Sequence, residues 1–130
     1  MTETRKQRIL IIEDDKHAVT VYKKKLEAEY ELMFAMDGVE GIRIAKEKSP
    51  DFIVLDLILP GEASGMRVLS DLKEYEITKD IPILVLTNLE GQHQTVIENG
   101  ALDCLIKSNT SINQVATMIN RYFDNYNKKG

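Results

Sequence analysis

Residues 51–56 read Asp-Phe-Ile-Val-Leu-Asp, a run of four apolar side chains that ends in a carboxylate. A strand that is buried on both faces of a parallel sheet shows such a continuous apolar run instead of alternation. Upstream, residues 9–15 repeat the arrangement as Ile-Leu-Ile-Ile-Glu-Asp-Asp. Both segments are therefore predicted to be central strands, over 52–56 and 8–13, with carboxylates at their C-terminal ends.

Strand and helix patterns alternate along the rest of the chain, which predicts an α/β domain with a mainly parallel sheet. Val39, Ile42 and Ala45 recur at helical spacing and are expected to share the inner face of one helix. The predicted strands cover 8–13, 31–36, 52–56, 81–86 and part of 102–107. The predicted helices cover 16–29, 38–48, 65–75, 90–99 and the segment after Ser108-Asn109-Thr110-Ser111.

Length and composition predict one soluble domain over residues 1–130, with flexible tails at 1–7 and 126–130. No apolar stretch approaches the roughly 18 residues of a membrane span, and the polar N-terminus lacks a signal-peptide core. A cytoplasmic location without membrane contact is expected. The net charge of −4 argues against direct nucleic-acid binding by this domain. The single cysteine, Cys104, excludes an intramolecular disulfide and is expected to be a buried apolar residue, with a redox role as the alternative.

Chemically active groups follow the predicted strands at their C-terminal ends, where ligands bind in an open α/β sheet. They are Glu13, Asp14 and Asp15 after the first strand, Asp56, Thr87 and Lys107. Mg²⁺ prefers oxygen ligands, often one or two carboxylates, and an aspartate beside such an ion can attack phosphorus. The pattern therefore predicts a magnesium site beside a nucleophilic carboxylate, whereas Asp15 is interpreted as a helix cap.

With these segments the chain resembles the receiver domain of two-component response regulators, over essentially its whole length. The resemblance rests on the segments 9–15, 50–61 (Pro-Asp-Phe-Ile-Val-Leu-Asp-Leu-Ile-Leu-Pro-Gly), 81–87 (Ile-Pro-Ile-Leu-Val-Leu-Thr) and 100–107 (Gly-Ala-Leu-Asp-Cys-Leu-Ile-Lys). Each motif alone is weakly specific, and their order and intervals make the resemblance strong. It implies a flavodoxin-like, doubly wound sheet of five parallel strands in the family's order 2-1-3-4-5, with five helices.

The resemblance also implies site roles. Asp56 would be the phosphoacceptor, charged by a sensor histidine kinase, a phosphotransfer protein or a small phosphodonor, while Thr87 and Lys107 would hold the phosphoryl oxygens. The implied Mg²⁺ ligands are Asp14, Asp56, Glu13 through water and the backbone carbonyl of Ile58. The domain would not be an enzyme with a separate substrate, but would assist its own phosphorylation and dephosphorylation. Its state would be read by a downstream protein or an output domain, with a homodimer possible through segments 90–99, 102–107 and the last helix.

Three positions depart from the commonest receiver pattern. Cys104 stands where a Tyr or Phe usually moves during switching, and a thiol is too small to copy that ring movement. Asn88 replaces a small residue and is expected to hinder the phosphodonor. Ser108 replaces a proline that follows a cis peptide bond; such a bond before serine costs about 3–4 kcal/mol, so Lys107 is expected to sit somewhat differently.

Two alternative functions stay open. The first is a docking module that signals without phosphate, which the three departures motivate. The second is a magnesium-dependent phosphohydrolase with an aspartyl nucleophile. Enzymes of the haloacid-dehalogenase type place a second aspartate two residues after the first, and this chain has Ile58 there.

Overall fold

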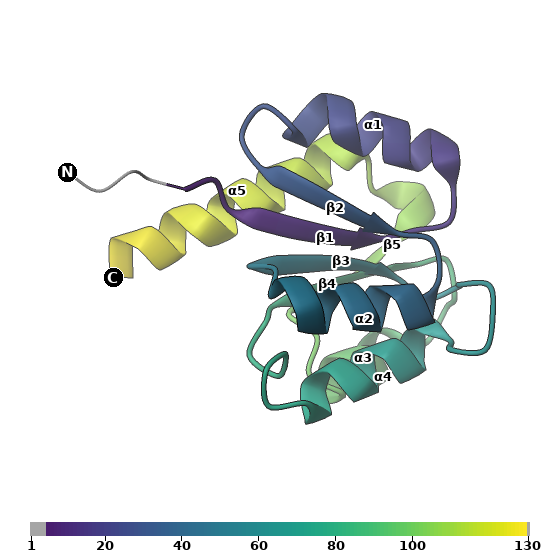
Figure 1. Ribbon diagram of the computed structural model, residues 1–130. Helices are drawn as coiled ribbons and strands as arrows, with labels where there is room; N and C mark the ends of the chain where they lie inside the picture. The colour runs from purple at the N-terminus through teal and green to yellow at the C-terminus, as the bar shows by residue number, and fades with distance from the viewer. Residues whose placement is uncertain (1–4, 130) are drawn as a thin grey trace.

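The computed structural model describes residues 5–129, with side chains described as far as residue 125. Within these residues, five parallel strands form one sheet in the order β2-β1-β3-β4-β5 (Figure 1). The strands are β1 (Arg8–Ile12), β2 (Glu31–Ala35), β3 (Phe52–Asp56), β4 (Ile83–Thr87) and β5 (Asp103–Ile106). The helices are α1 (Lys16–Leu26), α2 (Gly38–Lys48), α3 (Gly65–Glu74), α4 (His93–Glu98) and α5 (Ile112–Lys129), with a short 3₁₀ turn, η1 (Lys107–Asn109). The predicted fold class and sheet order are confirmed.

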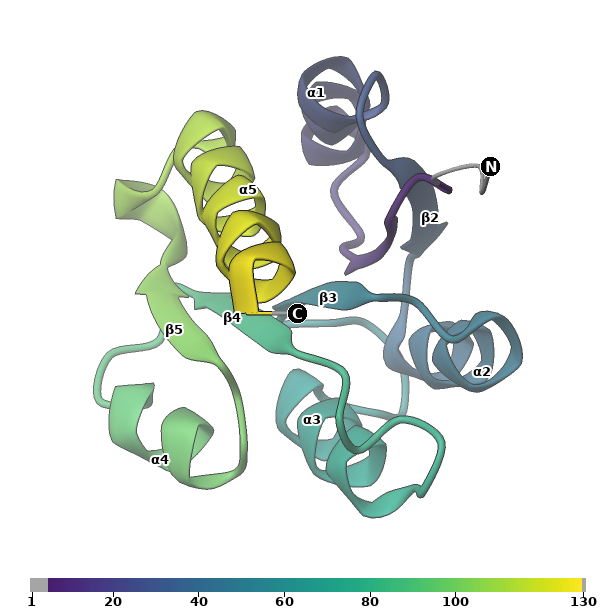
Figure 2. The same ribbon diagram turned by 90° about the vertical axis from the view of Figure 1, so that its left-hand side faces the viewer.

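Helices cover both faces of the sheet, with α1 and α5 on one face and α2, α3 and α4 on the other (Figure 2). Successive side chains of a strand point to opposite faces. Ile9 and Ile11 of β1 therefore join the core beneath α1 and α5, whereas Leu10 and Ile12 join the other core. All four are fully buried, which explains the uninterrupted apolar run in the sequence.

Several elements end one to three residues from their predicted bounds, as α1 does at Leu26 instead of residue 29, and two late starts have identifiable reasons. The strand predicted over 81–86 begins at Ile83, because Pro82 has no N–H to donate to a neighbouring strand. The helix predicted over 90–99 begins only at His93. Gly91 has a φ of 75°, a left-handed conformation that a right-handed helix cannot contain.

The interpretation of Val39 as an inward-facing residue is wrong, since its side chain is 60% exposed. Gly38 and Gly41 are buried on the same helix. A Cβ atom added to Gly41 would lie 2.6 Å from Ile12 Cδ1. The inner face of α2 therefore runs through glycines that allow a close approach to the sheet, and Val39 is turned outward.

The expected flexible tails lie partly outside the described residues, which exclude 1–4 and 130. In the described part, residues 5–7 precede β1 and the backbone of α5 runs to Lys129. No helix of this part combines the length and the apolar content that crossing a bilayer requires.

Candidate functional site

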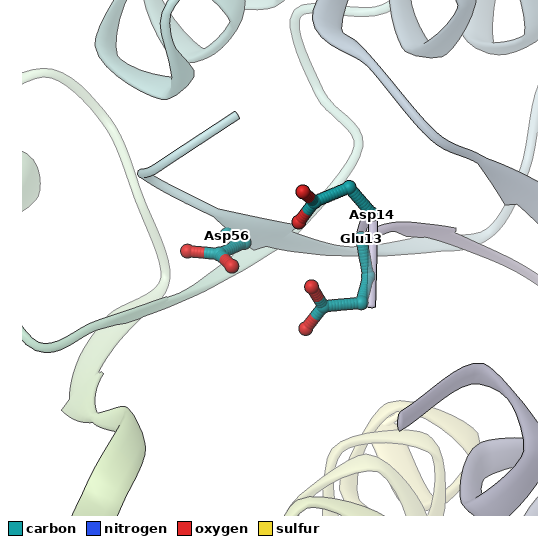
Figure 3. Close-up of side chains that lie close together, drawn as sticks. All are labelled: Glu13, Asp14 and Asp56. Carbon is teal, nitrogen blue, oxygen red and sulfur yellow. The ribbon is translucent and has the colours of Figure 1, made fainter. Parts of the chain in front are cut away.

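Three acidic side chains meet at the C-terminal edge of the sheet. Asp56 ends β3, and Glu13 and Asp14 follow β1. The two strands are neighbours, with Ile12 opposite Leu55, so the residues that follow them are brought side by side. One carboxylate oxygen from each acid lies within 4.8 Å of the others, as Figure 3 illustrates. The structure thus brings together the acids that the sequence placed at one sheet edge.

Asp56 is buried, and its two carboxylate oxygens have different partners. Oδ1 accepts a hydrogen bond from the Ile58 N–H at 3.0 Å, and Oδ2 accepts one from Lys107 Nζ at 2.7 Å. The same ammonium group lies 2.8 Å from Glu13 Oε1. Lys107 therefore bridges two buried acids that come from different strands, which compensates their loss of hydration.

The charges of this bridge follow from burial and pairing. Burial raises the pKa of the Glu13 carboxyl, against the lowering effect of hydrogen bonds from Lys107 and the Asp15 N–H. Burial alone would lower the pKa of Lys107, but its hydrogen bonds to Asp56 and Glu13 outweigh that effect and the pKa is raised. The ammonium group therefore stays charged at neutral pH and can neutralise an anion bound here.

An open pocket of about 510 Å³ lies over the acids, within the size range of small-ligand sites. Its lining consists of Asp14, Asp56, Ile58, Leu59, Pro60, Asn88 and Lys107. Thr87 is buried at the end of β4, and its Oγ1 accepts a hydrogen bond from the Leu89 N–H at 3.0 Å. The hydroxyl oxygen thus accepts a hydrogen bond from the loop that follows β4, and a hydroxyl group can donate its own proton at the same time.

Two of the departures from the receiver pattern contact each other. Asn88 Oδ1 accepts a hydrogen bond from the Ser108 N–H at 2.8 Å. The backbone of residues 5–129 contains no cis peptide bond, so the bond before Ser108 is trans. Sequence reasoning treated Asn88 only as an obstacle and missed this contact. The available signal was that both positions depart from the common receiver pattern and that they follow neighbouring strands.

Asp15 caps α1, as predicted. Its Oδ1 accepts a hydrogen bond from the His17 N–H at 2.9 Å, which satisfies a free N–H group of the first helical turn. Asp15 also donates its backbone N–H to Glu13 Oε2 at 3.2 Å. This hydrogen bond helps to hold the Glu13 side chain in the acidic cluster.

Cys104 is buried on β5 with 7% of its surface exposed, so the prediction of a buried small residue is confirmed. Burial, and then the charge of Asp103, raise the pKa of the thiol and so lower the reactive thiolate fraction. We expect iodoacetamide at pH 8 to label the folded protein at least about tenfold more slowly than the urea-unfolded protein. Mass spectrometry measures both rates without ambiguity because the chain has one cysteine. Equal rates would contradict the buried placement.

Known proteins share this fold and this sequence pattern. A profile of the response regulator receiver domain matches residues 9–120. The response regulator PleD of Caulobacter vibrioides is 38% identical over 103 residues, which cover 77% of this chain and 22% of PleD. The polar-differentiation response regulator DivK of Brucella ovis is 30% identical over 95 residues, which cover 71% of this chain and 76% of DivK.

Solved structures agree with these relatives. The receiver domain of a sensor histidine kinase from Pseudomonas aeruginosa superposes with a TM-score of 0.78 at 26% identity, covering 90% of this chain and 97% of that domain. That domain holds a magnesium ion coordinated in its active site cleft.

Proposed function

This chain belongs to the response regulator receiver family, and we propose that it is a phosphorylation-dependent switch with Asp56 as the phosphoacceptor. One observation carries the proposal. The buried Asp56 carboxylate lies 2.7 Å from the Lys107 ammonium and beside two further acids, and it lines an open pocket. Such a site combines a nucleophile with positive charge for an incoming phosphoryl group.

In the proposed reaction, an Asp56 carboxylate oxygen attacks the phosphorus atom of a phosphohistidine on a sensor kinase or phosphotransfer protein. The O–P bond forms and the N–P bond breaks, and the imidazole nitrogen keeps the electron pair and takes up a proton. Charge on the equatorial oxygens must be neutralised during the transfer. Lys107 supplies an ammonium group, and Thr87 donates its hydroxyl proton. The domain would thus assist its own phosphorylation and dephosphorylation without being an enzyme for a separate substrate.

The acidic cluster fits Mg²⁺, because it offers the hard oxygen ligands that this ion prefers. Asp14 and Asp56 would bind it directly, with the backbone carbonyl of Ile58. Glu13 would act through water, which agrees with its two oxygens already accepting from Lys107 and Asp15. When bound, Mg²⁺ would offset the repulsion between the carboxylates and the phosphoryl group.

The phosphoryl group carries roughly 1.5–2 negative charges at neutral pH, in place of the single charge of the free carboxylate, and these would attract the Thr87 hydroxyl. The loop after β4 would follow, which changes the populations of two arrangements of β4, α4, β5 and α5. Ile97, Leu102 and Ile106 expose 38–47% of their surfaces here and offer apolar contact to a partner. That partner would be a downstream protein, an output domain or a second copy of the chain. The chain spans only 22% of the length of PleD, so the output activity of that relative is not assigned to this chain.

The proposed setting is the cytoplasm, where kinases use ATP to make phosphohistidine. The net charge of −4 argues against direct contact between this domain and nucleic acid.

Mg²⁺ with fluoroberyllate, which mimics a phosphoryl group on a carboxylate, should shift backbone amide resonances between residues 87 and 107. The expected cause is attraction of Thr87 and Lys107 toward the new negative charge. Two-dimensional ¹H–¹⁵N spectra measure the shifts, with Mg²⁺ alone and fluoride alone as controls. Unchanged spectra would instead favour a docking module that works without phosphate.

A further inference from the structure

We infer that Asn88 is a positioning residue for phosphoryl transfer, which holds the backbone of Lys107 through the N–H group of Ser108. The inference rests on the proposed function, since Lys107 would neutralise the transferred group. Asn88 would thus help to place Lys107, whereas its size alone led to the expectation that it hinders the phosphodonor.

The backbone pairing of β4 and β5 stops just before Lys107. The last paired residues of β4 and β5 are Thr87 and Ile106. Beyond them, the Asn88 side chain accepts the Ser108 N–H at 2.8 Å. The side chain therefore continues the connection between the two segments after the backbone pairing has ended. Lys107 lies between the last pair and this bond, so its backbone is held on both sides.

Lys107 needs a fixed backbone position to reach its two partners. Its ammonium group must lie near two acids at once, at 2.7 Å from Asp56 and 2.8 Å from Glu13. A lysine side chain is long and flexible, so this placement depends on where its backbone is fixed. Thr110 closes the turn from within its own segment, donating its N–H to the Lys107 carbonyl. The bond from Asn88 is different because it ties the turn to β4.

Asn88 and Ser108 match each other as acceptor and donor. Ser108 lies in the first turn of η1, where an N–H has no acceptor within the helix. A proline at this position would have no N–H to donate, and a small residue at position 88 would have no side-chain oxygen to accept it. The two departures from the family pattern therefore complete one hydrogen bond.

The test uses substitutions that distinguish the effect of this hydrogen bond from the effect of the size of the Asn88 side chain. Ser108→Pro removes the donor and leaves Asn88 in place, Asn88→Ala removes the acceptor, and Ser108→Ala keeps the N–H as the matched control. The probe is acetyl phosphate with Mg²⁺: the Asp56 O–P bond forms, the P–O bond to acetate breaks, and acetate leaves with the electron pair. We expect Ser108→Pro and Asn88→Ala each to slow labelling about three- to tenfold, the factor of one typical hydrogen bond. Ser108→Ala should label like the wild type.

Two further variants show whether the effect passes through Lys107. The double variant Asn88→Ala with Ser108→Pro should be no slower than either single variant, because both remove the same bond. In a Lys107→Ala background, Asn88→Ala should leave the remaining rate unchanged. If Asn88 only obstructed the site, Asn88→Ala would label faster in both the wild-type and the Lys107→Ala background. If Asn88 only stabilised the fold, Asn88→Ala would have a lower melting temperature and an unaltered labelling rate. Either result overturns the inference.

Hydrogen exchange provides a readout that needs no phosphate. The Ser108 amide should exchange faster in Asn88→Ala than in the wild type, and equal rates would refute the bond itself. A wild type that never becomes labelled would overturn the proposed function and the positioning role with it. A labelled wild type with an equally fast Ser108→Pro variant would overturn the positioning role alone.

Discussion

Asp56→Asn is expected to reduce covalent labelling by a phosphodonor to below about 1% of the wild-type level, because an amide lacks the nucleophilic carboxylate oxygen. Asparagine has nearly the same size, and its Oδ1 can still accept the Ile58 N–H that Asp56 accepts at 3.0 Å. The variant should therefore fold normally while losing its chemistry. Radiolabelled acetyl phosphate and gel autoradiography measure the result, with circular dichroism to confirm the fold.

The matched control is Asp124→Asn, an equal change at an exposed position of α5. It should label like the wild type. Hydroxylamine should remove the label from the wild type and from Asp124→Asn, as expected for an acyl phosphate. Label that persists on Asp56→Asn at the wild-type level would place the acceptor elsewhere and contradict the assignment.

Gly65→Ala is expected to lower the free energy of unfolding by about 3 kcal/mol or more, the upper range for forced overpacking. A Cβ atom at this position would lie 2.3 Å from Leu57 Cα and 2.7 Å from the Asp56 carbonyl oxygen. Both contacts are with backbone atoms, which cannot rotate away as a side chain would. Gly65 also donates its N–H to the Leu57 carbonyl at 3.0 Å, so the clash strains the connection between β3 and α3. Urea unfolding measures the loss.

Gly91→Ala is the control for this change, because a Cβ atom there meets no atom within 4 Å. Its cost arises only from the positive φ of 75° and should be about 1–2 kcal/mol. If Gly65→Ala were as stable as Gly91→Ala, the close approach of α3 to the end of β3 would be refuted. The displaced strand end should also slow labelling of Asp56 in Gly65→Ala.

The fold could be predicted from the sequence because its signals are local. Runs such as 9–12 and 52–55 are apolar at every position, as expected of a strand that is covered on both faces of a parallel sheet. Alternation of such runs with helical periodicity then leaves few architectures. The gathering of Glu13, Asp14 and Asp56 at one edge followed from the same reasoning, since parallel strands end on the same side. Helix ends were predicted less accurately, since the helix predicted over 90–99 begins only at His93.

The sequence by itself therefore determined the alternation of strands and helices along the chain and the sheet edge where the acids meet. The order of the strands within the sheet followed from the family resemblance. Only the tertiary structure decided that one ammonium group bridges Asp56 and Glu13, that Val39 faces outward, and that Asn88 binds Ser108. The physical reason is that periodicity reports burial along a single element. Contacts between residues on different elements depend on distances of a few ångströms, which the packing of the whole chain sets.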